Sequence, residues 1–242
     1  NMRVLVTGGA GFIGACLTKM LVELSYQVSV LDNFSTGYKE NIISGIMLYE
    51  GDILDRDFTY HCVSKECPDV VIHLAAQVSV PKSLENPVFD ANINISGSVN
   101  LVEAARFNGV KKIIYASTAA VYGHPGHLPL DESHPVQPLS GYGLSKHTVE
   151  RYLCLYRELY GLDYTVLRYS NVYGPGQSAA GEGGVVAVFL DRILKGERPV
   201  VFGDGHQSRD FIHVSDVVSA NLSALVKGGG EVFNIGTGRA VS

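Results

Sequence analysis

Short apolar, β-branched runs alternate with longer stretches of helical spacing over the first two thirds of the chain. These strand-like and helix-like segments follow one another at 3–8, 14–24, 27–32, 69–76, 96–109 and 111–117. Such alternation is typical of a parallel sheet with helices on both faces. The runs at 70–74 and 112–116 are almost continuously apolar, as strands buried on both faces should be. The pattern predicts an α/β fold built on a doubly wound parallel sheet.

The composition and the hydrophobic pattern of the sequence change after Arg168. Glycine and proline become frequent at 171–184, and only short strand-like pieces follow, at 199–205 and 209–214. Long irregular segments inside a compact chain are usually functional. We therefore expect residues 1–168 to form the larger domain. Residues 169–242 are expected to be mostly a smaller substrate-binding lobe, interleaved with the larger domain.

Composition narrows the class of protein. A chain of 242 residues with 46% hydrophobic and 18% charged residues can bury a large core, as a globular enzyme does. Its formal net charge of −5 disfavours nucleic acid and anionic membranes as partners. No apolar run reaches the roughly 18 residues of a membrane-spanning helix. The cysteines are scattered, which favours reduced thiols and a cytoplasmic location; they are Cys16, Cys62, Cys67 and Cys154.

Three glycines follow the first predicted strand and lead into a helix. In VLVTGGAGFIG, Gly8, Gly11 and Gly14 permit a tight turn, close approach of the backbone to a pyrophosphate and close packing of helix on strand. Asp32 ends the next strand, where a carboxylate can accept hydrogen bonds from an adenosine ribose and would repel a 2′-phosphate. Together they predict NAD rather than NADP. The alternatives are a purely structural glycine turn and, for Asp32, a helix N-cap or turn residue.

A tyrosine and a lysine lie near the start of the helix predicted at 141–156. Tyr142 and Lys146 are four residues apart, so they share one helical face. A tyrosine with a pKa of about 10 is a poor base at neutral pH, and lowering it by three units takes about 4 kcal/mol. A lysine ammonium and a cationic nicotinamide ring are charges that supply such stabilisation. The YxxxK spacing is common by chance, so the pair taken alone is better explained as two solvent-facing side chains.

A hydroxyl pair, Ser117 and Thr118, follows the apolar run at 112–116, and Tyr142 comes 25 residues after Ser117. Combined with the glycine loop, this arrangement resembles the extended short-chain dehydrogenase/reductase family, the NAD-dependent epimerases and dehydratases of nucleotide sugars. The resemblance implies a Rossmann-type sheet and covers essentially the whole chain. Further matching stretches are GDI at 51–53, HLAAQ at 73–77, NISGSVNLVEAA at 94–105, RYSNVYGPGQ at 168–177, GDGHQSRDFIHVSDV at 203–217 and FNIGTG at 233–238.

The resemblance implies that residues 1–168 bind NAD and also carry the catalytic residues. Within that domain, Asp32 with Asn33 would hold the adenosine ribose, and Asp52 with Ile53 would border the adenine. The implied NAD-binding residues come from the glycine loop, the strand ends and two helices: Gly8, Gly11, Phe12, Ile13, Gly14, Asp32, Asn33, Asp52, Ile53, Leu74, Ala75, Ala76, Gln77, Asn94, Tyr142 and Lys146.

The catalytic residues implied by the resemblance are Thr118, Tyr142 and Lys146. Tyr142 would be the acid/base that handles the proton of the sugar hydroxyl. Lys146 would lower the pKa of Tyr142 and hold the nicotinamide ribose. Thr118 would hydrogen-bond the reacting sugar hydroxyl, with Ser117 as its less central neighbour.

The substrate implied is a UDP-sugar, bound by Thr118 and Tyr142 together with Asn171 and Arg209. The last two match positions that touch the diphosphate in this family. An arginine can pair phosphate oxygens with its planar fork, which an acidic protein needs for an anionic ligand. The alternative for Arg209 is a surface salt bridge with Asp210.

The two positions after Thr118 bear on the reaction, because both are alanine, Ala119 and Ala120. In this family, 4,6-dehydratases carry an acidic pair at this place and related decarboxylases carry a glutamate nearby. Without a carboxylate for a second reaction, the resemblance implies 4-epimerisation of the UDP-glucose 4-epimerase type. UDP-glucose and UDP-galactose would interconvert by transient oxidation to a 4-keto sugar, with no net redox change.

Two other functions stay open. A 4-epimerase of UDP-N-acetylhexosamine or UDP-glucuronate would share every motif named above. A non-catalytic dinucleotide-binding regulator would need only the glycine loop, so retention of Thr118, Tyr142 and Lys146 argues against it.

Further expectations concern assembly and completeness. By resemblance, the helices near 94–108 and 143–160 would pair two copies into a homodimer. The family usually runs beyond the NIGTG segment, so we expect the substrate lobe, which stops at Ser242, to be truncated.

His124 and His127 stand in a Pro/Gly turn without a third ligand, and no metal site is expected.

Overall fold

The main sheet has seven parallel strands in the order β3-β2-β1-β4-β5-β6-β9. The computed structural model describes residues 2–179 and 184–242. The strands are β1 (Arg3–Thr7), β2 (Gln27–Asp32), β3 (Met47–Glu50), β4 (Val70–His73), β5 (Lys112–Thr118), β6 (Asp163–Tyr169) and β9 (Glu231–Ile235). This order, with its reversal between β1 and β4, is that of a Rossmann-type doubly wound sheet, so the predicted fold class is confirmed.

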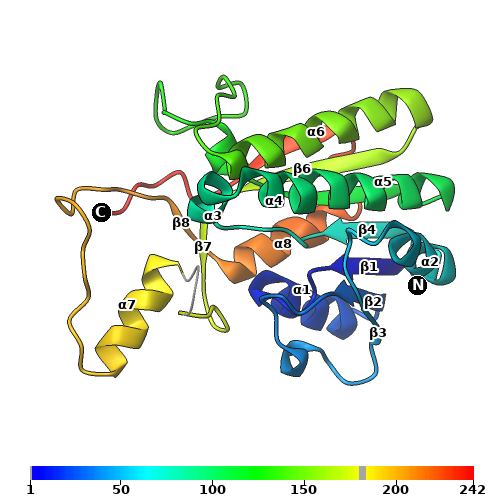
Figure 1. The fold of residues 1–242 in the computed structure, drawn as a ribbon, viewed down its shortest axis with the longest axis horizontal. Helices are drawn as coiled ribbons and strands as arrows, with labels where there is room; N and C mark the ends of the chain where they lie inside the picture. Colours follow the sequence, from blue (N-terminus) through cyan, green and yellow to red (C-terminus); the bar gives the residue numbers. More distant parts are fainter. Residues whose placement is uncertain (1, 180–183) are drawn as a thin grey trace.

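Helices cover both faces of the sheet (Figure 1). On one face, α1 (Phe12–Glu23) packs against α8 (Val214–Ala224). On the other face, α5 (Ser98–Phe107) packs between α2 (Arg56–Glu66) and α6 (Gly141–Tyr160). Because parallel strands connected by helices all point the same way, the loops that follow their carboxyl ends gather at one edge of the sheet.

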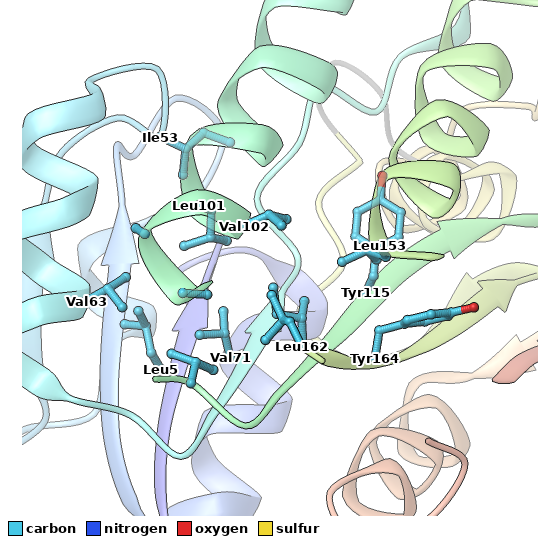
Figure 2. Packing of buried hydrophobic residues seen from close by; sticks show 14 of the residues in the cluster. Leu5, Ile53, Val63, Val71, Leu101, Val102, Tyr115, Leu153, Leu162 and Tyr164 are labelled. Atoms are coloured by element: carbon cyan, nitrogen blue, oxygen red, sulfur yellow. The ribbon is translucent and has the colours of Figure 1, made fainter. Parts of the chain in front are cut away.

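The core follows the two-residue period of the strands. Leu5 of β1 and Val71 of β4 face the α5 side, where Figure 2 shows them with Leu101 and Val102 of α5. Their strand neighbours face the opposite way and pack with α1 and α8. The near-continuous apolar runs in the sequence therefore correspond to strands that bury both faces.

A smaller part of the chain lies beside this sheet. β7 (Asn171–Tyr173) and β8 (Phe211–His213) form a two-stranded parallel sheet. α7 (Val185–Leu194) has no buried residue and lies apart from the main sheet in Figure 1. α8 and β9 then return to the seven-stranded sheet. The division of the chain at residue 168 stays a prediction.

Three short helical segments connect β4 to α5. They are α3 (Val80–Glu85), α4 (Pro87–Ala91) and the π-helix η2 (Asn92–Gly97). The helix expected at 96–109 thus begins at Ser98, after a turn of π-helix, and Gly109 follows its end with a φ of 70°. π-helical turns are rare and often lie at functional sites.

The prediction of a strand at 199–205 is wrong. In the described chain this stretch pairs with no strand, and Phe202 is 82% exposed. Gly203 and Gly205 have φ values of 80° and 78°, which turn the backbone out of the extended conformation. No helix of the described residues is long and apolar enough to cross a membrane.

Candidate active site

The glycine loop joins β1 to α1 at the carboxyl edge of the sheet. The surroundings of its three glycines differ in how much room they leave for a side chain. Gly8 has a φ of 73°, and a Cβ there would lie 2.7 Å from the Ala75 nitrogen. A Cβ on Gly14 would lie 2.7 Å from the Gly9 Cα, so α1 packs on the loop only without a side chain. At Gly11 the nearest atom would be 3.4 Å away. A methyl group at Gly11 would therefore make an ordinary van der Waals contact with the Gly8 carbonyl oxygen and would not collide with the protein.

The start of α1 fits an anion. Gly11 is its N-cap and supplies no side-chain acceptor, and the first turn carries no acidic residue. The backbone N–H groups at a helix N-terminus carry partial positive charge. The absence of a side chain at Gly11 and these N–H groups together fit a dinucleotide pyrophosphate. Phe12 and Ile13 begin the helix with their side chains partly buried against the core.

Asp32 lies at the end of β2 and is 7% exposed. Its carboxylate accepts the N–H of Ala10 at 2.8 Å and that of Phe34 at 2.8 Å. Asp32 thus shapes its own turn and ties it to the glycine loop. A carboxylate has about four acceptor sites, so two remain for ribose hydroxyls.

The expected adenine-binding residues divide into two groups. Asn33 donates its side-chain N–H to the Asp52 carboxylate at 2.8 Å, which brings the ends of β2 and β3 together. Ile53, in contrast, is 4% exposed and packs in the core against Gly97. Only the backbone of Ile53 is left to border a ligand.

Asn94 joins the segment after β4 to α6. Its side chain accepts the Gln77 backbone N–H at 2.8 Å and donates to the Gln77 carbonyl at 2.9 Å. The same amide group donates to the Ser145 hydroxyl on α6 at 3.1 Å and to the Asp90 carboxylate at 3.1 Å. Gln77, Asn94 and Ser145 of α6 therefore form one hydrogen-bonded unit.

The residues expected to handle the proton lie near one another at the end of β5. Tyr142, in the first turn of α6, lies beside the Thr118 side chain, which acts on its pKa. Burial raises the pKa of Tyr142 to about 12; the hydrogen bond with Thr118 acts in the lowering direction, and the charge of Asp90 acts in the raising direction. The protein without a ligand thus holds Tyr142 as a neutral phenol at pH 7.

Lys146 is 3% exposed and lies one turn after Tyr142 on α6. Its ammonium group donates to the Ala116 carbonyl of β5 at 2.9 Å and lies 5.0 Å from the centre of the Tyr115 ring. Burial lowers the pKa of Lys146 to about 8, against the raising effect of Asp90 and Glu150. Two of its three donors remain for a ligand.

Ser117 belongs to a different, buried cluster. Its hydroxyl donates to Glu150 at 2.5 Å, and the Arg168 guanidinium donates to both oxygens of the same carboxylate, at 3.0 and 2.7 Å. Arg168 also donates to the Tyr122 hydroxyl at 2.8 Å. Burial alone raises the pKa of Glu150, but the hydrogen bonds from Arg168 and Ser117 outweigh it and hold that pKa below its ordinary value.

The two residues expected at the substrate diphosphate lie in the smaller part of the chain. The Asn171 backbone N–H donates to the Asp210 carbonyl at 3.0 Å, so Asn171 and Arg209 lie near each other across β7 and β8. Arg209 is exposed, and its guanidinium donates to the Ser208 carbonyl at 2.8 Å. The Asp210 carboxylate accepts hydrogen bonds from Thr237 and Gly238 instead of pairing with Arg209 in the described chain.

Sequence patterns did not reveal two buried carboxylates, Asp90 and Glu150. An acidic residue inside the apolar stretch before Asn94 was the one signal for Asp90, and it is weak. No metal site was expected at His124 and His127. His127 Nε2 lies 3.3 Å from an Asp131 carboxylate oxygen. Among the residues described, no group of three or more His, Cys, Asp or Glu is arranged to hold a metal ion.

Comparison with known proteins agrees with this geometry. The UDP-glucose 4-epimerase of Mycolicibacterium smegmatis is 44% identical over 244 residues, which cover 98% of this chain and 78% of that protein. The crystal structure of UDP-glucose 4-epimerase with UDP-glucose from Thermotoga maritima superposes with a TM-score of 0.98 at 48% identity, covering 99% of this chain and 78% of that one.

A third similar structure has a different named substrate. It is the UDP-N-acetylglucosamine 4-epimerase of Methanobrevibacter ruminantium in complex with UDP-N-acetylmuramic acid, with a TM-score of 0.94 and 38% identity over 100% of this chain and 78% of that one. The family model for the NAD dependent epimerase/dehydratase family matches residues 4–236. The glycine loop, the Thr118–Tyr142 contact, the buried Lys146 and these matches lead to one conclusion: the chain belongs to the NAD-dependent epimerase/dehydratase family, and its cofactor is NAD.

Proposed function

We propose that this protein is a nucleotide-sugar 4-epimerase that interconverts UDP-glucose and UDP-galactose. The observation that carries the proposal is the turn after β5. Thr118 contacts Tyr142, and the next residues form the short 3-10 turn η3 (Ala119–Val121), which bears no carboxylate. Such a site can handle the proton of one sugar hydroxyl. It has no acid on that turn to expel water or to assist loss of a carboxyl group, so it favours epimerisation.

Asp90 is a carboxylate whose charge acts on Tyr142, so its possible role as an acid must be considered. It is 1% exposed, and one of its oxygens accepts hydrogen bonds from Gln77 and Asn94. A carboxylate enclosed in this way cannot serve as a general acid on the substrate, because it must lie within hydrogen-bond reach of the group that it protonates.

The NAD-binding residues proposed for this chain are those of the glycine loop, Asp32 and the unit around Asn94. When bound, NAD supplies a reversible acceptor and donor of hydride for C4 of the sugar. Lys146 would hold the nicotinamide ribose with the donors that Ala116 leaves free. The bound cofactor and the ammonium group of Lys146 would then add positive charge beside Tyr142.

Tyr142 would take the proton of the 4′-hydroxyl and later return it. In the protein without a ligand its pKa of about 12 opposes this role, so the positive charges must stabilise the phenolate. Thr118, which lies beside Tyr142, would share the proton through a hydrogen bond. Asn171 and Arg209 are the groups proposed to bind the UDP diphosphate, which their adjacent backbone positions and the exposed guanidinium support.

A homodimer through α5 and α6 is part of this proposal. Phe107, Leu144, Leu155 and Leu159 on these helices are each at least 47% exposed. Such apolar side chains support a partner surface but do not identify the partner.

The test is a panel of UDP-sugars incubated with the protein and NAD. We expect UDP-galactose and UDP-glucose to interconvert, and Tyr142→Phe to reduce turnover about 100-fold or more. Tyr160→Phe, at the exposed end of the same helix, is the control and should keep full activity. Conversion of N-acetylated sugars or UDP-glucuronate alone would move the proposal to those substrates. Absence of any turnover, with NAD bound, would favour a regulator.

A further inference from the structure

Asp90 is a buried carboxylate that the proposed reaction does not use directly. It lies near the end of α4, one turn before Asn94, and is 1% exposed. Buried carboxylates are almost always paired with a cation. In the described part of the chain, however, no Lys, Arg or His nitrogen lies within the 4.0 Å of an ion pair with Asp90.

Neutral amide groups hold this charge in place. One Asp90 oxygen accepts the side-chain N–H of Gln77 at 2.8 Å and that of Asn94 at 3.1 Å. Asn94 in turn bonds the Gln77 backbone and Ser145 of α6. Asp90 therefore fixes the orientation of the amide group that connects the NAD-side segment with the catalytic helix.

The charge of Asp90 acts on both catalytic groups of α6. It raises the pKa of Lys146 against burial, and it also raises the pKa of Tyr142. Lys146 is the only one of the two that carries charge in the resting protein. The carboxylate thus stabilises an ammonium group that is otherwise almost entirely removed from water.

The other titratable groups around Lys146 and Asp90 are compensated, neutral or exposed. Glu150 on α6 is paired with Arg168 of β6 and with His147. His73 on β4 is neutral, because burial lowers its pKa to about 3, and burial raises the pKa of Tyr115 on β5 well above its ordinary value. Lys82 and Glu85 on α3 are exposed to solvent. Asp90 and Lys146 are thus the two buried charges in this part of the described chain that have no bonded counter-ion.

We propose that Asp90 is a positioning residue that keeps Lys146 in its ammonium form and holds Asn94 against the NAD-side segment. This inference rests on the proposed function for its catalytic meaning, since the ammonium form is the one that assists Tyr142. In physical terms, Asp90 sets the pH range over which a buried lysine stays charged.

The test uses Asp90→Asn, which keeps an oxygen to accept the bonds from Gln77 and Asn94 but removes the charge. Glu85→Gln, an exposed acid on the adjoining α3, is the matched control. Removing a negative charge lowers the pKa of both Lys146 and Tyr142. Both limbs of the pH profile of kcat should therefore move to lower pH in Asp90→Asn, and the ratio of kcat at pH 6 to kcat at pH 9 should rise roughly threefold to tenfold. Glu85→Gln should match the wild type.

A second readout does not need turnover. Titration of the Lys146 side chain followed by NMR should move to lower pH in Asp90→Asn, with Lys146→Met used to assign the signal. Asp90→Ser gives the same measurement if the Asn variant does not fold. An unchanged Lys146 titration in the folded variant overturns the role of Asp90. Failure of the wild type to epimerise any UDP-sugar, while the Lys146 titration still moves, would overturn the proposed function alone.

Discussion

At the scale of single residues, hydroxyl groups of similar kind have very different partners in this site. The Tyr122 hydroxyl donates to the Asn234 side chain at 2.6 Å and accepts from Arg168 at 2.8 Å. The Tyr115 hydroxyl is buried and has no hydrogen-bond partner among the described residues. A buried hydroxyl without a partner loses its hydration and gains nothing in return.

We expect Tyr115→Phe to leave the free energy of unfolding unchanged or to raise it by about 1 kcal/mol. The phenyl ring keeps the contact with the Lys146 ammonium, which lies 5.0 Å from the ring centre. Tyr122→Phe is the matched control and should lower the free energy of unfolding by about 1–3 kcal/mol, because it leaves Arg168 and Asn234 with an unmet bond. Urea unfolding of both variants measures the difference. Equal destabilisation by the two substitutions would contradict the assignment of partners.

At the scale of elements, two glycines of the glycine loop are needed for different reasons. Gly14 is needed for packing of the fold, and Gly11 is proposed to be needed for binding of NAD. Gly14→Ala should lower the free energy of unfolding by about 1–3 kcal/mol or more, because its Cβ meets the backbone of Gly8 and Gly9. Gly11→Ala should fold normally, since its Cβ would have its nearest neighbour at 3.4 Å and its φ of −75° suits any residue. That methyl group would instead occupy the place proposed for the pyrophosphate.

Thermal unfolding and NAD titration of the two variants distinguish these effects. Gly11→Ala is expected to keep the Tm of the wild type and to weaken NAD binding about tenfold or more, which corresponds to about 1.4 kcal/mol or more. Unweakened NAD binding by Gly11→Ala would show that the dinucleotide does not cross the loop at this point.

A chain of buried hydrogen bonds connects β1, β4 and the helical segment η2. The Thr7 hydroxyl accepts the Ala75 N–H at 3.2 Å and donates to His73 Nδ1 at 2.7 Å. His73 Nε2 donates to the Ser98 hydroxyl at 2.8 Å, and Ser98 donates to the Asn94 carbonyl at 2.5 Å. This assignment of donors requires neutral His73 protonated on Nε2.

This neutral histidine predicts a loss of stability in acid. Burial, with a smaller effect of the Lys146 charge, lowers the pKa of His73 from 6.5 to about 3. The unfolded chain therefore takes up a proton below pH 6.5 that the folded protein refuses, so the stabilisation is complete above pH 6.5 and is lost as the pH falls towards 3. At pH 5 the loss is about 2 kcal/mol.

Urea unfolding at pH 7.5 and pH 5 checks this prediction when His73→Gln is compared with the wild type. The variant should lose about 2 kcal/mol less than the wild type between the two pH values, whatever its stability at pH 7.5. The same pH dependence in both proteins would mean that His73 is not held neutral.

At the scale of the whole molecule, much of the fold was predictable because its signals are local. The apolar runs mark the strands of the main sheet, and the glycine loop, Thr118 and Tyr142 all lie at the ends of these elements. Residues at the carboxyl edge of one parallel sheet come together whatever the details of the packing. The candidate site could therefore be outlined from short stretches of sequence.

What the sequence did not predict depends on contacts between distant residues. Asp90 contacts Gln77 and Asn94, and Glu150 contacts Ser117 and Arg168, with no periodicity to indicate either cluster. The error at 199–205 has the converse cause. Its β-branched residues favour a strand, but no strand of the described chain lies beside it to complete the pairing.

The buried cluster around Arg168 also connects parts of the molecule. Arg168 on β6 pairs with Glu150 on α6 and, through Tyr122, reaches Asn234 on β9. Asn234 donates its backbone N–H to Glu132 at 2.7 Å, in the loop between β5 and α6. Helix α6 and the β9 edge of the sheet are therefore held in one arrangement.

The central claim is that C4 of the sugar loses and regains the same hydrogen, with no elimination between the two steps. It is tested most directly by incubating the protein and NAD in ordinary water with UDP-galactose that carries deuterium at C4. The account predicts UDP-glucose that retains the deuterium at C4. Replacement of that deuterium by solvent hydrogen, or release of a 4-keto-6-deoxy sugar, would contradict it.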